Sequence, residues 1–307
     1  MKKLRLAVLA GGRSGEREIS LKSGELVCRS LDKSKYNVVE YDLFRDLKVF
    51  IESINEIDLA FVLLHGKFGE DGSIHGLLNI LGIPYVGSGV LSSAMSMNKK
   101  VAKEIFKTAG LAVVKDVPLR RGESFSIGEI IDVLGPAAIV KPVAEGSSLG
   151  VSLCRNKEEL FSGIETAFQY DKDILVEEYL EGRETSCCVM GDRDLDTLPL
   201  IEIVPIEKYG FFNSKAKYTP NTIKEICPAP FNAALTKRVQ ECAKKAHRAL
   251  RCSVWSRTDM IIRGEDIFLL ETNTIPGMTE NSLFPLAARS AGISMTQLLD
   301  RLIMLSL

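Results

Sequence analysis

The sequence of 307 residues lacks the features that mark several large classes of protein. It has 39 Lys and Arg against 40 Asp and Glu, so it has no basic excess for binding nucleic acid non-specifically. No apolar run approaches the roughly 18 residues of a membrane span, so neither nucleic acid nor a membrane is an expected partner. Its composition, 46% hydrophobic and 26% charged, is that of a folded globular chain and excludes a disordered one.

The number and spacing of the seven cysteines exclude two further kinds of structure. Their number is odd and none of them form a C-x-x-C pair, so neither a disulfide framework nor a zinc ribbon is indicated. A reducing cytoplasm is therefore the expected location. The first ten residues briefly resemble a signal peptide, but charge returns at Arg13 and Glu16. A buried β-strand is the better interpretation of this segment.

The first ninety residues alternate apolar runs with segments of helical periodicity. Continuous apolar runs are typical of strands buried on both faces. The expected elements are strands over residues 4–9, 38–43, 59–64 and 83–86 and a helix over residues 19–31. This alternation predicts a small α/β unit with a parallel sheet.

The rest of the chain changes character. A helix over residues 98–109 is followed by strand candidates, then by a helix near residues 235–251 and a helical tail over residues 286–305. The expected strands lie at 137–143, 151–153 and 174–179, with mostly strands from residue 184 onward. Boundaries near residues 95 and 182 fit these shifts, which divides the chain into residues 1–95, 96–182 and 183–307.

A hairpin is predicted over residues 254–262 and 267–272. If it turns about residue 265, Asp259 lies opposite Glu271 and Arg257 lies opposite Asn273, all on one face. Two carboxylates and an amide oxygen form a ligand set suited to Mg²⁺. The alternative is a solvated hairpin face on which Arg257 neutralises its neighbours, and the spacing alone does not decide between the two.

Two loops could bind phosphate groups. Residues 145–150 follow Lys141 and are small and polar, but there is no P-loop motif, so a surface turn is the more economical interpretation. Residues 10–15 narrowly miss the G-x-G-x-x-G pattern of dinucleotide-binding enzymes, a competing hypothesis. Against it, Glu16 would place a carboxylate where a pyrophosphate should lie. Glu16 would instead cap a helix or hold a substrate ammonium group.

Single residues carry weaker signals. Ser282 precedes a predicted helix, where it would serve as an N-cap or leave the helix start to receive a carboxylate; capping alone is the simpler interpretation. His65 ends a predicted strand, where open α/β sheets bind ligands. His75 is expected to be structural, and His247 to lie at the surface or in packing.

Taken together, five segments in order resemble the D-alanine–D-alanine ligases of the ATP-grasp superfamily, over about residues 4–305. They are GGRSGEREIS at residues 11–20, HGKFGEDG at residues 65–72, KPVAEGSSLG at residues 141–150, RTD at residues 257–259 and ETNTIPGMT at residues 271–279. The resemblance implies an α/β fold, with α+β character in its C-terminal part. It also implies ATP-grasp architecture, an N-terminal Rossmann-like domain with a parallel sheet, and ATP between the central and C-terminal domains.

The resemblance also implies the residues of the nucleotide and metal sites. Lys99 and Lys141 correspond to phosphate-binding lysines, and Glu184 to a ribose carboxylate. The adenine-binding strand corresponds to Glu177, Glu178 and Leu180. The ligands of two Mg²⁺ ions, with Mn²⁺ as a substitute, correspond to Asp259, Glu271 and Asn273.

For the amino-acid substrates, the resemblance implies that Glu16 orients the first ammonium group and that His65 belongs to the substrate site. Arg257 and the Gly277 amide correspond to oxyanion donors, and Ser147 and Tyr218 to partners of Glu16 in a hydrogen-bonded triad. The groups around the second D-alanine correspond to Lys217, Ser282 and Leu283. Lys217 also corresponds to an ATP-binding residue.

The implied reaction is ATP-dependent ligation of two D-alanines through D-alanyl phosphate, for peptidoglycan synthesis, by a homodimer. Residues 208–222 are the expected lid, and Phe212 to Lys215 depart from the family's usual aromatic-acidic-aromatic run. Tyr218 favours a dipeptide, because relatives that use D-lactate tend to lack it. The alternatives are the same fold with D-lactate or D-serine as second substrate, a nucleotide-binding protein without ligase activity and, least supported, a dinucleotide-dependent oxidoreductase.

Overall fold

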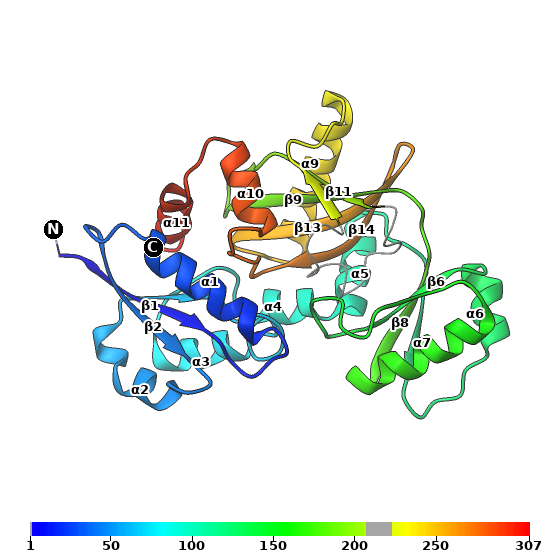
Figure 1. Cartoon of the computed structure of the whole chain (residues 1–307), viewed down its shortest axis with the longest axis horizontal. Helices are drawn as coiled ribbons and strands as arrows, with labels where there is room; N and C mark the ends of the chain where they lie inside the picture. The colour runs from blue at the N-terminus through cyan, green and yellow to red at the C-terminus, as the bar shows by residue number, and fades with distance from the viewer. Residues whose placement is uncertain (1, 207–222) are drawn as a thin grey trace.

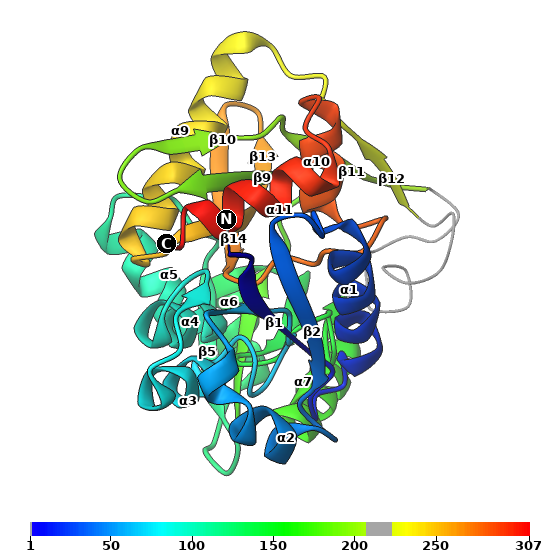
Figure 2. The same cartoon turned by 90° about the vertical axis from the view of Figure 1, so that its left-hand side faces the viewer.

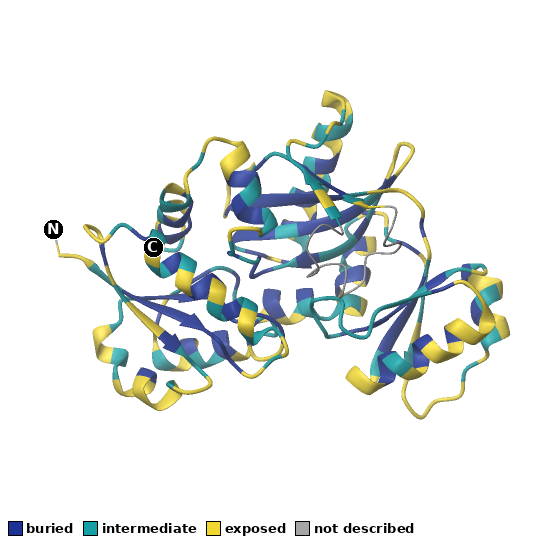
Figure 3. Cartoon of the chain, viewed as in Figure 1, coloured by how far each residue is buried: buried dark blue, intermediate teal, exposed yellow. Residues whose placement is uncertain are grey.

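The computed structural model describes residues 2–206 and 223–307. Its strands form three sheets that lie in a row along the long axis of the molecule (Figure 1). The buried positions follow the strands of these sheets and the inner sides of the helices that cover them (Figure 3).

The first sheet is parallel, with the strand order β2-β1-β3-β4. It comprises β1 (Leu4–Ala10), β2 (Tyr36–Asp42), β3 (Leu59–Val62) and β4 (Tyr85–Val86), with helices α1 (Arg17–Ser30), α2 (Leu47–Glu52) and α3 (Ser73–Leu81) and the short 3₁₀ helix η1 (Ile54–Glu56). The apolar run that opens the sequence is therefore strand β1, which lies between β2 and β3 as a strand buried on both faces should. The predicted α/β unit with a parallel sheet is confirmed.

The second sheet is antiparallel, with the order β5-β8-β6-β7. It comprises β5 (Asp116–Arg120), β6 (Ala138–Pro142), β7 (Ser152–Cys154) and β8 (Asp173–Glu178). The helices of this part of the chain are α4 (Val90–Met97), α5 (Lys99–Thr108), α6 (Ile127–Leu134) and α7 (Lys157–Tyr170). Helices α6 and α7 bury their apolar faces against this sheet. Asn98 precedes α5, and its side chain caps the helix by accepting from the Val101 amide.

The third sheet is built around β9, which pairs antiparallel with β11, β13 and β10. It comprises β9 (Arg183–Gly191), β10 (Leu195–Thr197), β11 (Ile201–Pro205), β12 (Ile223–Ile226), β13 (Val254–Arg263) and β14 (Asp266–Asn273), with helices α9 (Ala233–Ala249), α10 (Leu283–Ser290) and α11 (Met295–Met304). The single helical tail predicted over residues 286–305 is wrong. Gly292, with φ of 75°, separates two helices there, because the left-handed region cannot continue an α-helix.

Helices α10 and α11 return to the core of the first sheet: α11 packs beside α1, and α10 packs against α11 and β9 (Figure 2). Their core joins that of the first sheet through Trp255, whose ring meets Phe61 and Phe284 edge-on at centroid distances of 6.1 and 5.2 Å. The strand sets change between Val86 and Asp116 and again between Glu178 and Arg183. The domain boundaries near residues 95 and 182 stay predictions.

Candidate active site

A cavity of about 1240 Å³ is lined by residues of the second and third sheets, of helix α1 and of the segment after β3. Every predicted site residue that the structure describes lines this cavity. They are Glu16, His65, Lys99, Lys141, Ser147, Glu177, Glu178, Leu180, Glu184, Arg257, Asp259, Glu271, Asn273, Gly277, Ser282 and Leu283. Lys217 and Tyr218, and the expected lid over residues 208–222, lie outside the described residues.

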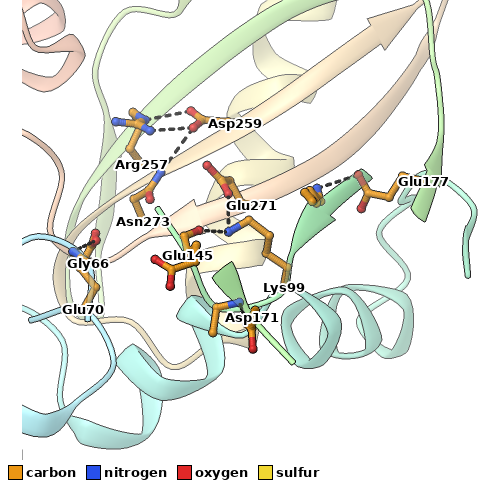
Figure 4. A network of polar contacts seen from close by, with 12 residues as sticks. Gly66, Glu70, Lys99, Glu145, Asp171, Glu177, Arg257, Asp259, Glu271 and Asn273 are labelled. Atoms are coloured by element: carbon orange, nitrogen blue, oxygen red, sulfur yellow. Dashed lines mark hydrogen bonds and ion pairs between the residues drawn. The ribbon is translucent and has the colours of Figure 1, made fainter. Parts of the chain in front are cut away.

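The hairpin of β13 and β14 has the predicted register. Asp259 is paired with Glu271, and Arg257 with Asn273. The ladder is irregular immediately after Asp259, where a bulge changes the pairing. The side chains of Arg257, Asp259 and Asn273 meet on one face, as period-two alternation requires (Figure 4).

Arg257 and Asp259 form a two-pronged ion pair with N–O distances of 2.9 and 2.7 Å. Ser186 on β9 donates a further hydrogen bond to Asp259, at 2.6 Å. Burial alone would lower the pKa of Arg257, but the adjacent Asp259 carboxylate raises it above its ordinary value. Arg257 is therefore a permanent cation in the cavity wall, held in a fixed orientation by its partner.

The donor set of the hairpin fits divalent cations. The Asn273 amide nitrogen lies 3.4 Å from Asp259, and the Lys99 ammonium group lies 3.4 Å from Glu271, so cationic or polar groups already face both carboxylates. Within residues 2–206 and 223–307, no three His, Cys, Asp or Glu side chains gather as a metal cluster. The predicted set has two carboxylates and one amide, so it needs water or substrate oxygens to complete a coordination shell, as Mg²⁺ commonly does.

Glu16 lies at the start of α1, directly after the glycine loop. Its backbone carbonyl accepts from Ile19 and Ser20, but its side chain does not cap the helix. Ser147 donates to the Glu16 carboxylate instead. The capping alternative is therefore wrong, and the carboxylate faces the cavity in contact with Ser147, one of its two predicted partners.

Two glycines make room for the Glu16 carboxylate. A Cβ atom at Gly66 would lie 2.7 Å from Glu16 Oε2, and one at Gly146 would lie closer still. Gly66 also has φ of 70°, a conformation that side chains disfavour. The glycines of two separate motifs thus serve the same carboxylate.

Glu70 is a partly buried glutamate that the sequence argument missed, although it lies inside the quoted motif HGKFGEDG. It lines the cavity and accepts a 2.7 Å hydrogen bond from the Gly66 amide. Burial, reinforced by the negative charge of Glu16, raises the pKa of Glu70 to about 8. Glu70 is therefore largely protonated at neutral pH in the ligand-free protein.

The histidines separate as follows. His65 is buried at the cavity wall, with Nε2 3.5 Å from Ser23 Oγ, while its carbonyl accepts from Ser14. His75 is buried and packs edge-on against Tyr85, as a structural residue. His247 is buried with Nδ1 2.8 Å from Ser256 Oγ, so of its two predicted environments the surface is wrong and packing is right.

The loop over residues 145–150 does not behave as a plain surface turn. Ser147 and Ser148 both adopt positive φ, and Glu145, Gly146, Ser147 and Ser148 line the cavity. Lys67 pairs with the Glu145 carboxylate, and Lys99 donates to the Glu145 carbonyl at 2.7 Å. These contacts tie the loop to the segment after β3 and to the start of α5, and the surface-turn interpretation is wrong.

The opposite end of the cavity, near β8, is rich in cations. Lys141 Nζ lies 2.6 Å from Glu177 Oε2, and the Glu178 carboxylate accepts from the Lys115 amide at 2.9 Å. Although burial alone would raise the pKa of Glu177, the adjacent Lys141 and Lys103 lower it. Lys103 was missed by the sequence argument, because its neighbours in sequence predict only an amphipathic helix.

Ser282 precedes α10 as predicted, but its hydroxyl does not cap the helix. Its Oγ accepts from the Thr279 amide at 3.0 Å and lies 2.8 Å from the Thr279 hydroxyl. A Cβ at Gly277 would come within 2.8 Å of this oxygen, so glycine keeps the segment close-packed. Capping by the side chain is wrong, and Ser282 and Leu283 line the cavity at the start of this helix.

None of the helices in the described ranges combines the length and apolar character that a membrane crossing requires. The described cysteines are all free thiols.

Comparison with known proteins identifies the fold and the family. The family models for the D-ala D-ala ligase C-terminus and N-terminus match residues 105–304 and 42–88. The D-alanine–D-alanine ligase of Syntrophobacter fumaroxidans is 52% identical over 305 residues, covering 99% of this chain and 98% of its own. That of Desulfotalea psychrophila is 49% identical over 308 residues, covering 99% and 95%.

Solved structures agree with these sequence matches. The Bacillus anthracis D-alanine–D-alanine ligase complexed with ATP superposes with a TM-score of 0.87 at 35% identity, covering 99% of this chain and 97% of its own. A D-Ala:D-Ser ligase from Enterococcus faecalis superposes with a TM-score of 0.86 at 32% identity over the whole of both chains. The ATP-grasp architecture is thereby confirmed, and the chain belongs to the D-alanine–D-alanine ligase family.

Proposed function

We propose that this protein is an ATP-dependent ligase that joins two D-alanines into D-alanyl-D-alanine through a D-alanyl phosphate, for peptidoglycan synthesis. The observation that supports this most is the division of one cavity into two ends. Lys99 and Lys141 line the end that would receive phosphates, and Glu16 and Glu70 line the end that would receive an amino group. Arg257 lies between them, where a carboxylate would be activated (Figure 4).

The nucleotide would lie between the second and third sheets. Lys99 and Lys141 would neutralise the phosphates, while Glu177, Glu178 and Leu180 would receive the adenine and Glu184 the ribose. Phosphoryl transfer requires in-line placement and compensation of negative charge more than covalent chemistry from the protein. Contacts with Glu145, Glu177 and Glu271 keep these lysines at the cavity wall before a nucleotide binds.

The residues for two Mg²⁺ ions, with Mn²⁺ as a substitute, would be Asp259, Glu271 and Asn273. Bound there, the ions would neutralise charge on the transferring phosphate. Arg257 already holds Asp259 in place, and Lys99 holds Glu271. The ligands are therefore oriented before any substrate binds.

On the amino-acid side, the Glu16 carboxylate would orient the ammonium group of the first D-alanine, beside His65. The second D-alanine would be held by its carboxylate near Ser282, Leu283 and Lys217. Its amine must lose a proton before it attacks, because an α-ammonium group is mostly protonated near neutrality, with a pKa of about 8. The Ser147 hydroxyl, which donates to Glu16, and the Tyr218 hydroxyl are the groups proposed to carry this proton.

Attack on the acyl phosphate forms a tetrahedral oxyanion. Arg257 and the Gly277 amide are the proposed donors to it, and loss of one such donor typically costs about 3 kcal/mol of barrier. Collapse of this species releases phosphate and leaves the peptide bond. Because acyl phosphates hydrolyse, residues 208–222 would have to exclude water during the reaction.

The same cavity would also serve D-serine or D-lactate as second substrate. The full-length likeness to a D-Ala:D-Ser ligase supports keeping D-serine as the alternative. Tyr218 argues against D-lactate. We further propose a cytoplasmic homodimer: free thiols in the described residues and the use of ATP support the location, and family membership supports the dimer.

The test is phosphate release from ATP with Mg²⁺ and D-alanine, with the product identified by mass. D-alanyl-D-alanine in amounts equal to phosphate would establish the reaction. Phosphate release without dipeptide would overturn the second-substrate assignment, and competition with D-serine would then identify the alternative. No release that depends on D-alanine would overturn the first-substrate assignment at Glu16.

A further inference from the structure

A buried ion cluster lies behind the wall of the nucleotide end of the cavity; it consists of Lys103, Asp116, Lys141 and Glu177. Lys103 Nζ donates to Glu177 Oε1 at 2.7 Å and lies 3.0 Å from Asp116 Oδ1. Lys141 Nζ lies 2.6 Å from the other oxygen of the same carboxylate, Glu177 Oε2. Each oxygen of Glu177 therefore has a lysine of its own.

The strand register explains why these groups converge. Asp116 on β5 is directly opposite Glu177 on β8, and Ile139 on β6 is opposite Glu177 from the other side. Lys141 is two residues beyond Ile139, so it points to the same face of the sheet. Like charges placed directly opposite each other on a sheet repel, so Asp116 and Glu177 require a cation between them.

Helix α5 supplies that cation. Lys103 is four residues after Lys99, so both project from one face of the helix. Lys99 reaches the cavity and contacts Glu271, whereas the side chain of Lys103 is 1% exposed and lies under the cavity wall. Lys103 does not line the cavity, while Lys99, Lys141 and Glu177 do.

We propose that Lys103 is a positioning residue for nucleotide binding: it keeps Glu177 paired when Lys141 turns toward the phosphates of ATP. This inference rests on the proposed function, in which Lys141 binds phosphate. With Lys103 in place, Lys141 leaves a carboxylate that still has a partner. Without Lys103, Lys141 is the sole close cation of a buried carboxylate, and its release would strand that charge in a low-dielectric site.

The experiment measures binding of ADP with Mg²⁺ by calorimetry, without D-alanine, for wild type, Lys103→Met and Lys107→Met. Lys107 is the matched control, since it lies one turn further on α5, 3.6 Å from Asp116, with its side chain 45% exposed. We expect Lys103→Met to weaken binding about tenfold or more, and Lys107→Met to change it less than about twofold. The KM for D-alanine should stay within about twofold in both variants.

A second variant separates positioning from folding. Lys103→Met/Asp116→Asn removes one positive and one negative charge, so the cluster keeps its net charge. We expect it to recover thermal stability relative to Lys103→Met while its ADP affinity stays weak. Recovery of both together would overturn the inference, as would wild-type affinity in folded Lys103→Met.

The outcomes also separate this inference from the proposed function. If the wild-type protein binds no ADP or forms no dipeptide, the proposed function fails whatever Lys103 does. If wild type binds ADP and forms dipeptide, and the Lys103 variants bind ADP as tightly as wild type does, only the proposed role of Lys103 is wrong.

Discussion

Glu70 and Glu177 are two glutamates at opposite ends of one cavity (Figure 4). The pKa values of their carboxyl groups are shifted in opposite directions. Glu70 faces the negative charge of Glu16, and burial raises its pKa to about 8. Glu177 is more deeply buried, yet its pKa is lowered because Lys141 and Lys103 each contact one of its oxygens. Burial alone therefore does not set the charge of a carboxyl group; the ion that shares its site does.

The difference has a chemical meaning for the cavity. The end near Glu177 carries cations anchored by carboxylates, which suits a polyphosphate. The end near Glu70 places two carboxyl groups, those of Glu16 and Glu70, at the cavity wall, which suits an incoming ammonium group. The boundary between the ends is the hairpin of β13 and β14, where Arg257 pairs with Asp259 and Lys99 approaches Glu271.

The largest effect is expected at this boundary. Glu271→Gln should lower kcat about 1,000-fold or more while the protein stays folded, because the neutral amide no longer supplies a metal-binding charge beside the phosphate. The measurement is dipeptide formation across a Mg²⁺ titration, with circular dichroism to check the fold. Asp266→Asn, an exposed change on the same strand, is the control. Near-normal turnover at low Mg²⁺ would remove Glu271 from the metal site.

The next effect concerns stability and pH in the ligand-free protein. The pKa of Glu70 is raised from its ordinary value of 4.5 to about 8, so between these pH values the folded state binds more protons than the unfolded chain. Stability must then fall as pH rises through this window, by roughly 2–4 kcal/mol. Urea unfolding of Glu70→Gln should lack this fall.

The control is Glu123→Gln, at an exposed position. In this variant the free energy of unfolding should fall with rising pH as it does in wild type. Glu177 has the opposite sign: its lowered pKa contributes stability that is present above its ordinary value and is lost as pH falls. If the stability of Glu70→Gln fell with rising pH as steeply as that of wild type, the opposite roles assigned to Glu70 and Glu177 would be wrong.

A smaller effect is expected at the ammonium end. Glu16→Gln should raise the KM for D-alanine about tenfold or more, because a charge-assisted contact with the substrate ammonium is lost. Binding of ADP with Mg²⁺ should change by less than about twofold, and Glu18→Gln on the exposed side of α1 should change neither. If ADP binding weakened instead, the division of the cavity into two ends would be wrong.

The smallest effect concerns product choice. Tyr218→Phe should raise incorporation of D-lactate relative to D-alanine a few-fold as pH falls, because protonation disfavours the amine and leaves the hydroxyl unaffected. Mass spectrometry of products from a mixture of the two substrates measures this ratio. If the ratio of D-lactate to D-alanine incorporation were the same as in wild type, the proposed role of Tyr218 would be wrong.

Local pattern predicted much of this molecule because local geometry dictates it. Period-two alternation placed Asp259 opposite Glu271, and alternating apolar runs predicted the parallel sheet. The buried ion cluster could not be found this way, since Lys103 and Glu177 are separated by 74 positions and meet only when the fold brings α5 next to β8. Ser282 was misassigned for a similar reason. Its position is that of an N-cap, but its hydroxyl accepts a hydrogen bond from the Thr279 amide.

The return of α10 and α11 to the first sheet has a consequence for synthesis on the ribosome. The core of the first sheet includes Phe284, Leu298 and Leu302, and Thr296 is anchored to the Ser30 carbonyl at the end of α1. These residues are translated long after β1 to β4. Until they are made, part of the apolar surface of the first sheet stays exposed. The unit that is made first is among the last to be finished, and translation pauses before residue 283 would prolong its exposure to chaperones and proteases.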